Sequence, residues 1–177
     1  MRKTTSGFTI VELLIVVVII AILAAITIVA YNGIQQRAKV SALVSGLKAS
    51  DKALRLYATD QGFNTWPRDN AIISGYTNPT LQTFIAQTTT FKNYMQTAPN
   101  VANSPTLSWF YDNDDDIKPA CGSRYNGTNI IIIGLDQSTA EAVDATLDDG
   151  DIACGKVRYT TVDSYLFYTL SYSSVME

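Results

Sequence analysis

Glu12 is the side chain of this sequence whose type and surroundings most require a chemical explanation. It lies near the start of a 23-residue apolar stretch, Phe8–Ala30, in which Thr9 and Thr27 are the other polar residues. An ionisable side chain inside an apolar helix is costly without a partner and is a functional candidate by default. Nothing else in the segment can pair with the carboxylate. We therefore expect its partner to come from elsewhere, or Glu12 to lie at the water interface.

The other groups that could do chemistry are few. The 177 residues include no histidine and two cysteines, which excludes histidine triads, histidine-rich zinc sites and four-cysteine metal sites. Carboxylates are numerous, but no spacing singles out a pair for acid–base catalysis. We predict a protein that is not an enzyme and that needs no cofactor.

The two cysteines, Cys121 and Cys154, are 33 residues apart, and each is followed by a glycine. A redox-active pair is disfavoured because the spacing is not that of a Cys-x-x-Cys motif. A single disulfide is the preferred interpretation, and it would contribute about 3–4 kcal/mol by the chain-entropy treatment. Because disulfides persist outside the reducing cytosol, we expect this part of the chain to lie outside it.

Two acidic runs raise the question of calcium. Asp112–Asp116 resembles the first half of an EF-hand loop, but Ile117 stands where glycine is needed and Ser123 where glutamate is needed. An EF-hand is therefore excluded. An irregular calcium site that uses these acids, or those of Asp148–Asp151, stays open as an alternative. A solvated acidic loop is the preferred interpretation, so no metal site is predicted.

The apolar stretch that carries Glu12 is too long for a strand and is expected to be a helix. Its 23 residues would span about 35 Å, which exceeds the roughly 30 Å of a bilayer's hydrocarbon core. A cleavable signal peptide is an alternative, but the stretch is too long and Ile28-Val29-Ala30 is a poor cleavage site. A plain membrane anchor explains the length and leaves Glu12 unexplained.

Helical periodicity continues beyond the apolar stretch. Apolar residues recur at spacings of three, four and seven as far as Ala58, which is typical of an amphipathic helix. Asp60-Gln61-Gly62 is a natural stop, with Gly62 just past the end. The whole helix, Phe8–Gln61, would be about 80 Å long. One small domain cannot cover it, so its first half must be buried in lipid or in copies of itself.

The rest of the chain is expected to form an acidic head. Residues 57–177 hold six of the thirteen basic and fourteen of the sixteen acidic side chains. Such a head is a poor nucleic-acid binder, so nucleic acid is not expected as a direct main partner. The pattern predicts helices over 79–94 (capped by Asn78) and 138–147 (opened by a Ser138–Glu141 capping box), and strands over 107–111, 129–135, 156–161 and 164–172.

The stretch Gly7–Glu12 (GFTIVE), after a short basic leader, resembles the prepilin cleavage and methylation motif of type IV pilins. The resemblance implies that a membrane peptidase cuts between Gly7 and Phe8 and methylates the new amine of Phe8. It also implies that Glu12 pairs with the terminal amine of a neighbouring subunit during assembly. An opposite charge of this kind compensates a carboxylate that is buried away from water.

This resemblance implies an α+β fold, in which a long N-terminal hydrophobic helix packs against a small antiparallel-sheet head. Four parts follow: a leader (1–7), a transmembrane and filament-core half of the helix (8–30), an amphipathic half (31–61), and a head (62–177). By the same resemblance, Cys121 and Cys154 bound the C-terminal disulfide region of the head.

The function that the resemblance implies is that of a structural subunit of a type IV pilus, serving adhesion, motility or DNA uptake. Its partners would be copies of itself bound through the helix, the prepilin peptidase and the pilus assembly machinery. The chain would cross the cytoplasmic membrane once, with the head outside, before it joins an extracellular pilus. One alternative is a pseudopilin of a type II secretion or competence system. A secreted binding domain with a signal peptide is less favoured.

Overall fold

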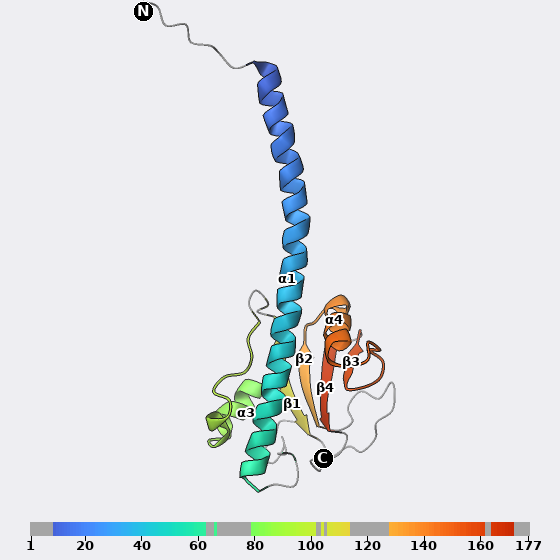
Figure 1. The fold of residues 1–177 in the computed structure, drawn as a ribbon. Helices are drawn as coiled ribbons and strands as arrows, with labels where there is room; N and C mark the ends of the chain where they lie inside the picture. Colours follow the sequence, from blue (N-terminus) through green and yellow to red (C-terminus); the bar gives the residue numbers. More distant parts are fainter. Residues whose placement is uncertain are drawn as a thin grey trace, which may run out of the picture. The chain divides into compact units, whose positions relative to one another are not determined.

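The computed structural model describes residues 9–62, 66, 79–101, 104, 106–113, 128–161 and 164–171. These residues form the α+β fold that was predicted, with a long N-terminal helix and an antiparallel sheet (Figure 1). The elements are α1 (Ile10–Asp60), α3 (Leu81–Gln87), a short 3-10 helix η1 (Phe91–Asn93), β1 (Ser108–Asn113), β2 (Thr128–Ile133), α4 (Gln137–Leu147), β3 (Val157–Thr160) and β4 (Tyr165–Ser171).

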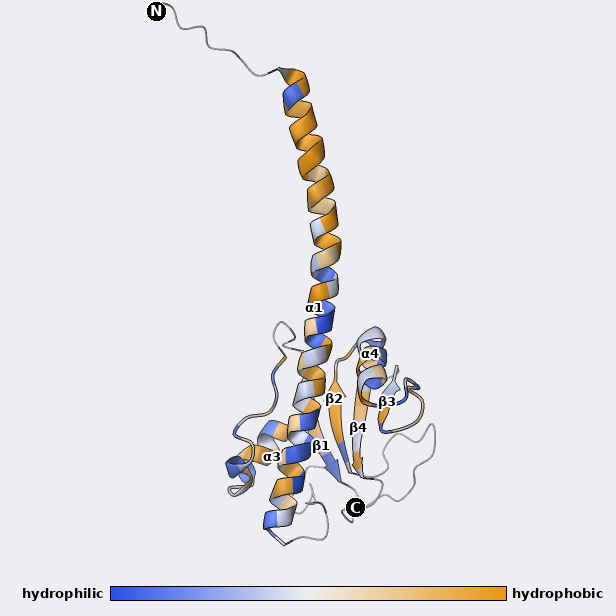
Figure 2. Cartoon of the chain, in the orientation of Figure 1, coloured by the Kyte–Doolittle hydropathy of each residue, from blue (hydrophilic) through white to orange (hydrophobic). Residues whose placement is uncertain are grey.

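The chain divides into two compact units, residues 1–38 and 39–177, and α1 contributes to both. In the first unit, the large apolar side chains between Ile10 and Ile34 are 50–80% exposed. In Figure 2, most of this part of α1 has the colour of hydrophobic residues. By length and composition, α1 is the one helix among the described residues that could cross a membrane.

In the second unit, the remainder of α1 is amphipathic and buries one face. Leu43, Leu47 and Leu54 have no exposed surface. The helix ends at Asp60, and Gly62 follows with φ +68°, its backbone N–H donating to the Thr59 carbonyl at 3.0 Å. This left-handed conformation favours glycine. The end of the helix just before Gly62 confirms the predicted stop.

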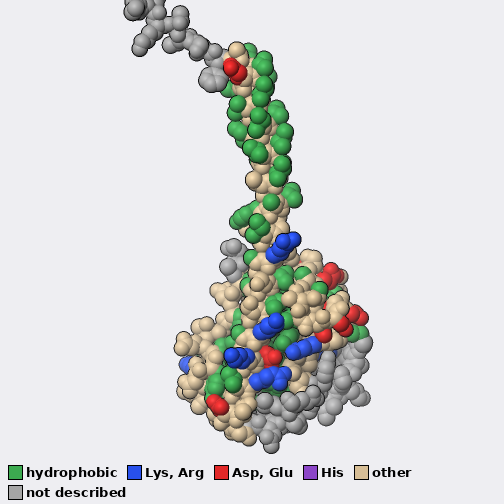
Figure 3. Space-filling view, in the orientation of Figure 1, with side chains coloured by type: hydrophobic (Ala, Val, Ile, Leu, Met, Phe, Trp, Pro, Cys, Tyr) green, Lys and Arg blue, Asp and Glu red, His purple; other side chains and the backbone are tan. Residues whose placement is uncertain are grey.

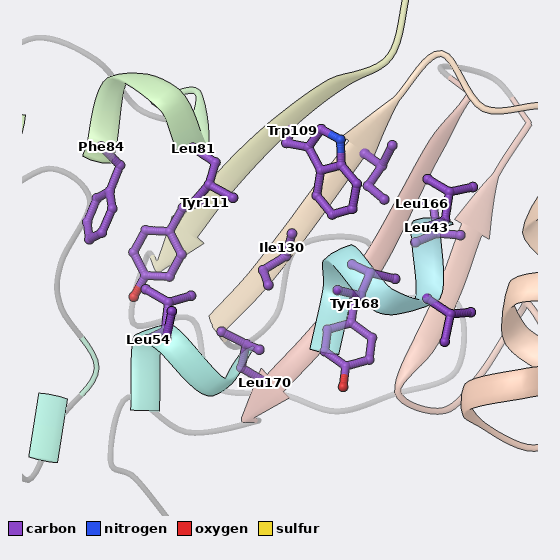
Figure 4. Packing of buried hydrophobic residues seen from close by; sticks show 14 of the residues in the cluster. Leu43, Leu54, Leu81, Phe84, Trp109, Tyr111, Ile130, Leu166, Tyr168 and Leu170 are labelled. Carbon is purple, nitrogen blue, oxygen red and sulfur yellow. The ribbon is translucent and has the colours of Figure 1, made fainter. Parts of the chain in front are cut away.

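The sheet has the strand order β1-β2-β4-β3, with every neighbouring pair antiparallel. One face of it packs against the second half of α1 and against α3, as Figure 4 shows for part of the cluster. Alternate residues of each strand point into this core, as the two-residue period of a strand requires. The core residues from the strands are Trp109, Tyr111, Ile130, Ile132, Val157, Leu166, Tyr168 and Leu170.

The opposite face of the sheet carries a buried polar network centred on Arg158, which is 6% exposed. Its Nη2 donates to Thr169 Oγ1 at 2.8 Å and to Asn129 Oδ1 at 3.3 Å. Thr169 Oγ1 in turn donates to Asn129 Oδ1 at 2.9 Å. A buried charge of this kind is tolerated because it is hydrogen-bonded.

The helix predicted over 79–94 is shorter than expected. It begins at Leu81, after an N-cap at Thr80 whose hydroxyl accepts from the Thr83 N–H at 3.1 Å. Pro79 instead lies beside β1, and its carbonyl accepts the Tyr111 N–H at 3.2 Å. The proposed cap Asn78 lies outside the described residues. The helix ends at Gln87, and the 3-10 turn η1 replaces its predicted second half.

The helix predicted over 138–147 is confirmed, but its predicted cap is wrong. The N-cap is Asp136, whose Oδ1 accepts the Thr139 N–H at 2.9 Å, and the helix begins at Gln137. Glu141 instead accepts from Gln137 one turn earlier. The Ser138 hydroxyl donates to Asp136 at 2.8 Å rather than capping the helix itself. The carboxylate is preferred because it accepts several donors at the positive end of the helix.

Candidate functional site

The first turn of α1 holds Glu12 in a reciprocal hydrogen-bond arrangement with Thr9. Glu12 Oε2 accepts the backbone N–H of Thr9 at 2.8 Å and its hydroxyl at 2.7 Å. The Glu12 N–H donates back to Thr9 Oγ1 at 3.2 Å. This is a capping box, in which the side chains at the N-cap and three residues later satisfy each other's free backbone donors. The carboxylate also lies at the end of the helix that favours negative charge.

The expectation that nothing in the segment can pair with Glu12 is therefore wrong. It considered opposite charges, whereas Thr9 offers two neutral donors. The sequence did contain the signal, since Thr9-Ile10-Val11-Glu12 fits the Ser/Thr-x-x-Glu signature. Neutral donors orient a carboxylate but leave its charge uncompensated, so the need for a cationic partner persists wherever water is excluded.

The surroundings of Glu12 are apolar but uncovered. Its neighbours Val11 and Leu13 are 63% and 62% exposed, and the exposed apolar surface continues along the helix. Soluble proteins rarely expose contiguous apolar patches of such extent unless these contact a membrane or another protein. A carboxylate can only accept hydrogen bonds or pair with a cation. This site is thus suited to charge pairing inside an apolar contact.

The two residues of the predicted cleavage and methylation site, Gly7 and Phe8, lie outside the described residues. Cleavage between them and methylation of Phe8 therefore stay predictions. The structure places Thr9 and Glu12 immediately after them, at the start of a helix.

Cys154 lies half-buried in the loop between α4 and β3, and its backbone N–H donates to the Asp151 carbonyl at 2.9 Å. Its predicted partner, Cys121, lies outside the described residues. The disulfide between them stays a prediction.

The end of α4 gathers carboxylates that sequence reasoning had only partly noticed. Asp144, Asp148 and Asp149 can each bring one oxygen within 4.8 Å of the others. Burial raises the pKa of Asp144 to about 6, with further contributions from the neighbouring charges of Asp148, Asp149 and Asp151. Asp144 was missed, although its spacing of four residues from Asp148 predicts that both lie on one helix face.

The other acidic run does not form a comparable group in the described part of the chain. Asp112 is fully buried in β1 and accepts a hydrogen bond from Asn129 Nδ2 at 3.5 Å. The acids that follow it, Asp114–Asp116, lie outside the described residues.

Comparisons with known proteins point to the same N-terminal region. Residues 2–28 match the family described as the prokaryotic N-terminal methylation motif. The chain is 38% identical over 71 residues to the fimbrial protein EcpC of Eikenella corrodens, covering 40% of this chain and 45% of that protein. It is 37% identical over 70 residues to the type IV major pilin protein PilE of Neisseria gonorrhoeae, covering 40% of this chain and 41% of that protein.

A longer match extends into the head. The chain is 31% identical over 130 residues to a fimbrial protein of Neisseria meningitidis serogroup A, covering 69% of this chain and 75% of that protein. The first two relatives are matched over less than half of their own lengths. No solved structure matches the chain significantly.

Proposed function

Because the chain belongs to the type IV pilin family, we propose that it is a structural subunit of a type IV pilus, with no catalytic role of its own. The observation that carries this proposal is the first part of α1, where large apolar side chains are 50–80% exposed around one acidic residue. Lipid can cover this surface before assembly. In a filament, the same surface of neighbouring copies would cover it, since apolar burial drives both associations.

Processing by a prepilin peptidase is the first step of the proposed function. The peptidase would hydrolyse the peptide bond between Gly7 and Phe8, and the free amine of Phe8 would then be methylated. The match to the methylation motif supports this step, because it includes both residues. Removal of the leader places a new ammonium group four residues before Glu12.

The geometry of Glu12 supports its proposed role in assembly. Oε2 accepts both donors of Thr9, whereas no hydrogen bond reaches Oε1 from the residues that the structure describes. One carboxylate oxygen is thus held by the chain itself, and the other can accept the terminal ammonium of a neighbouring subunit. Within an apolar filament core, this pair would compensate two charges that are otherwise costly to bury.

The proposed topology follows from the same parts. The precursor would cross the cytoplasmic membrane once through α1, with the head on the outer side, where a Cys121–Cys154 disulfide can persist. Assembly would then move the subunit into an extracellular pilus.

The test separates the charge of Glu12 from its capping role. In the Glu12→Gln variant, the glutamine can still complete the capping box with Thr9, but it cannot pair with an ammonium group. We expect Glu12→Gln and Glu12→Ala to be processed and inserted into the membrane, and both to form no filaments by electron microscopy of sheared surface material. Glu141→Gln, which removes an exposed carboxylate from α4, is the matched control and should assemble normally.

Filaments at wild-type yield from Glu12→Gln would refute the charge pairing. Intact-mass analysis of the mature chain tests the processing step, for which we expect a methylated N-terminal Phe8. A terminus at Tyr31 would instead indicate a cleaved signal peptide. A correctly processed chain that yields no surface filaments would favour a pseudopilin over a pilus subunit.

A further inference from the structure

The carboxylates at the end of α4 form a compact group that the proposed pilus role does not use. Asp144 lies in the last turn of the helix, and Asp148 and Asp149 follow it directly. One oxygen from each lies within 4.8 Å of the others. Figure 3 shows acidic side chains gathered on this side of the head. Among the described residues, no lysine or arginine forms an ion pair with any of the three.

Asp144 distinguishes this group from an ordinary acidic surface. Its side chain is fully buried, and neither carboxylate oxygen accepts a hydrogen bond of normal geometry within the described part of the chain, although the backbone N–H of Gly150 lies close enough to oppose the rise in its pKa. Burial of a polar group without a partner is costly, and burial of a charge costs more. Asp148 and Asp149 are exposed, so the group opens to solvent on one side. A buried acceptor therefore faces two further carboxylates where a cation can enter.

We propose that Asp144, Asp148 and Asp149 form a binding site for one calcium ion. All three ligands are carboxylate oxygens, which hard divalent cations prefer. Oxygens that bind calcium at about 2.3–2.6 Å can be up to about 5 Å apart, so three oxygens that lie within 4.8 Å of one another can bind the same calcium ion. Magnesium requires near-octahedral geometry and loses its waters reluctantly, whereas calcium tolerates an irregular arrangement of carboxylates. Water on the exposed side completes the coordination shell.

Asp148 is held in place for this role by the chain that follows it. Its Oδ2 accepts the backbone N–H of Val157 at 3.0 Å and the N–H of Lys156. Gly155 has φ +82°, and a Cβ at this position would collide with Asp148 Oδ2. The bound ion would thus join the end of α4 to the start of β3, across the loop that contains Cys154. This inference is independent of the pilus proposal.

Calcium titration of the full-length chain in detergent tests the site. Three carboxylates with exposed waters predict a weak site, with a dissociation constant of about 10⁻⁴–10⁻³ M. At ten times that concentration, calcium chloride should raise the melting temperature of the head by about 4 °C. In Asp144→Asn, isothermal titration should show at least a tenfold weaker affinity, and the calcium-dependent shift should disappear. Glu141→Gln, which removes one charge from the same helix, should bind like the wild type.

The Asp144→Asn head should melt at or above the wild-type temperature without calcium, because the substitution removes a buried charge beside two others. If this variant fails to fold, Asp149→Asn replaces it, since Asp149 is exposed and should also lose affinity without a folding defect. The proposal is overturned if calcium does not bind the wild type, or if it binds Asp144→Asn equally well. An equal shift with magnesium chloride at the same concentration would overturn the assignment to calcium.

Discussion

The two parts of α1 contain similar apolar side chains but place them in opposite surroundings. From Ile10 to Ile34 the large apolar side chains are 50–80% exposed, whereas those of Leu43, Leu47 and Leu54 are completely buried. The first part is apolar on all sides, and the second is apolar on the face that meets the sheet. The same helix thus has one part with an uncovered apolar surface and one part that packs into the core of the head. The apolar surface of the first part is of a kind that contacts lipid or other chains, whereas the second part is covered by residues of its own chain.

The glycines of the two parts show the same difference. A Cβ added to Gly33 would meet nothing within 4 Å, whereas a Cβ at Gly46 would lie 2.8 Å from Pro99 and 2.9 Å from Trp109. Glycine costs helix stability at both positions. At Gly46 this cost allows the helix to approach Pro99 and Trp109 closely. At Gly33 no described residue lies close enough to require a glycine.

Deletion of residues 1–38 should produce the largest change, because it removes the exposed part of α1 and leaves the buried part. The buried core consists of residues from Leu43 onwards, so the remaining chain should keep its fold and lose its need for detergent. Size-exclusion chromatography without detergent should show a monomer, and circular dichroism should show a cooperative melt. A truncated chain that aggregates or lacks secondary structure would show that the first part of α1 stabilises the head after all.

Leucine-to-alanine substitutions in the two parts should differ strongly. Leu54→Ala should lower the free energy of unfolding by about 3 kcal/mol, because it removes a fully buried side chain and leaves a cavity. Leu23, which is 57% exposed, is the matched position in the first part, and Leu23→Ala should leave this free energy unchanged. Urea unfolding in detergent, followed by tryptophan fluorescence, measures both. Equal losses would contradict the division into two parts.

Glycine-to-alanine substitutions sharpen the contrast further. Gly46→Ala should destabilise the head by about 1–3 kcal/mol, because the new methyl group overpacks against Pro99 and Trp109. Gly33→Ala should instead raise the helicity of the first part, with a gain of up to about 1 kcal/mol in helix propensity. Thermal melts measure the stability of the head in Gly46→Ala, and far-UV circular dichroism measures the helicity in Gly33→Ala. A stabilised Gly46→Ala head would mean that the close approach is not needed.

The smallest effect is expected at Lys39, where the second part of α1 begins. Lys39 Nζ donates to Asp136 Oδ2 at 3.0 Å, and Lys39→Met should cost at most about 1 kcal/mol at neutral pH, since the pair is partly exposed. Burial tends to raise the pKa of Asp136, but hydrogen bonds from Thr139, Lys39 and Ser138 outweigh it and hold this pKa well below its usual range.

The sign of the pH dependence follows from that lowered pKa. The stability that the Asp136 carboxylate contributes is fully present above its ordinary pKa of 3.8 and is lost as the pH falls below it. The difference in stability between Lys39→Met and the wild type should therefore shrink in acid, as urea unfolding at pH 7 and at successively lower pH values can show. A difference that grows in acid would contradict the pairing.

Much of this fold follows from periodicity in the sequence. The long helix, its stop at Gly62, the helix before Leu147 and four strands were all predicted, because apolar spacing reports which face is buried. The caps were not all predicted. Asp136 rather than Ser138 opens α4, and Thr80 rather than Asn78 opens α3, because tertiary contacts select among several residues that could cap. Arg158 is a similar case, since its burial depends on Asn129 and Thr169 from other strands.

The candidate sites show the same division. Glu12 stands out in the sequence because a charge in an apolar stretch is locally visible. The Asp148–Asp151 run is also visible in the sequence, because its acids are adjacent. The burial of Asp144 is not visible there, because burial depends on how α4 packs against the sheet. The Thr9–Glu12 cap also has a short-range signature, Thr-x-x-Glu, that a consideration of opposite charges alone does not detect.

The position of the capping box also determines how removal of the leader would affect the start of α1. Thr9 and Glu12 both lie after Gly7, so a cut at that position would remove the leader without touching either partner. The same two residues would therefore cap the first turn of the helix both before and after cleavage. Cleavage would thus change the charge at the N-terminus and leave the conformation of the first helical turn unchanged. A subunit would then join the filament with this turn already formed.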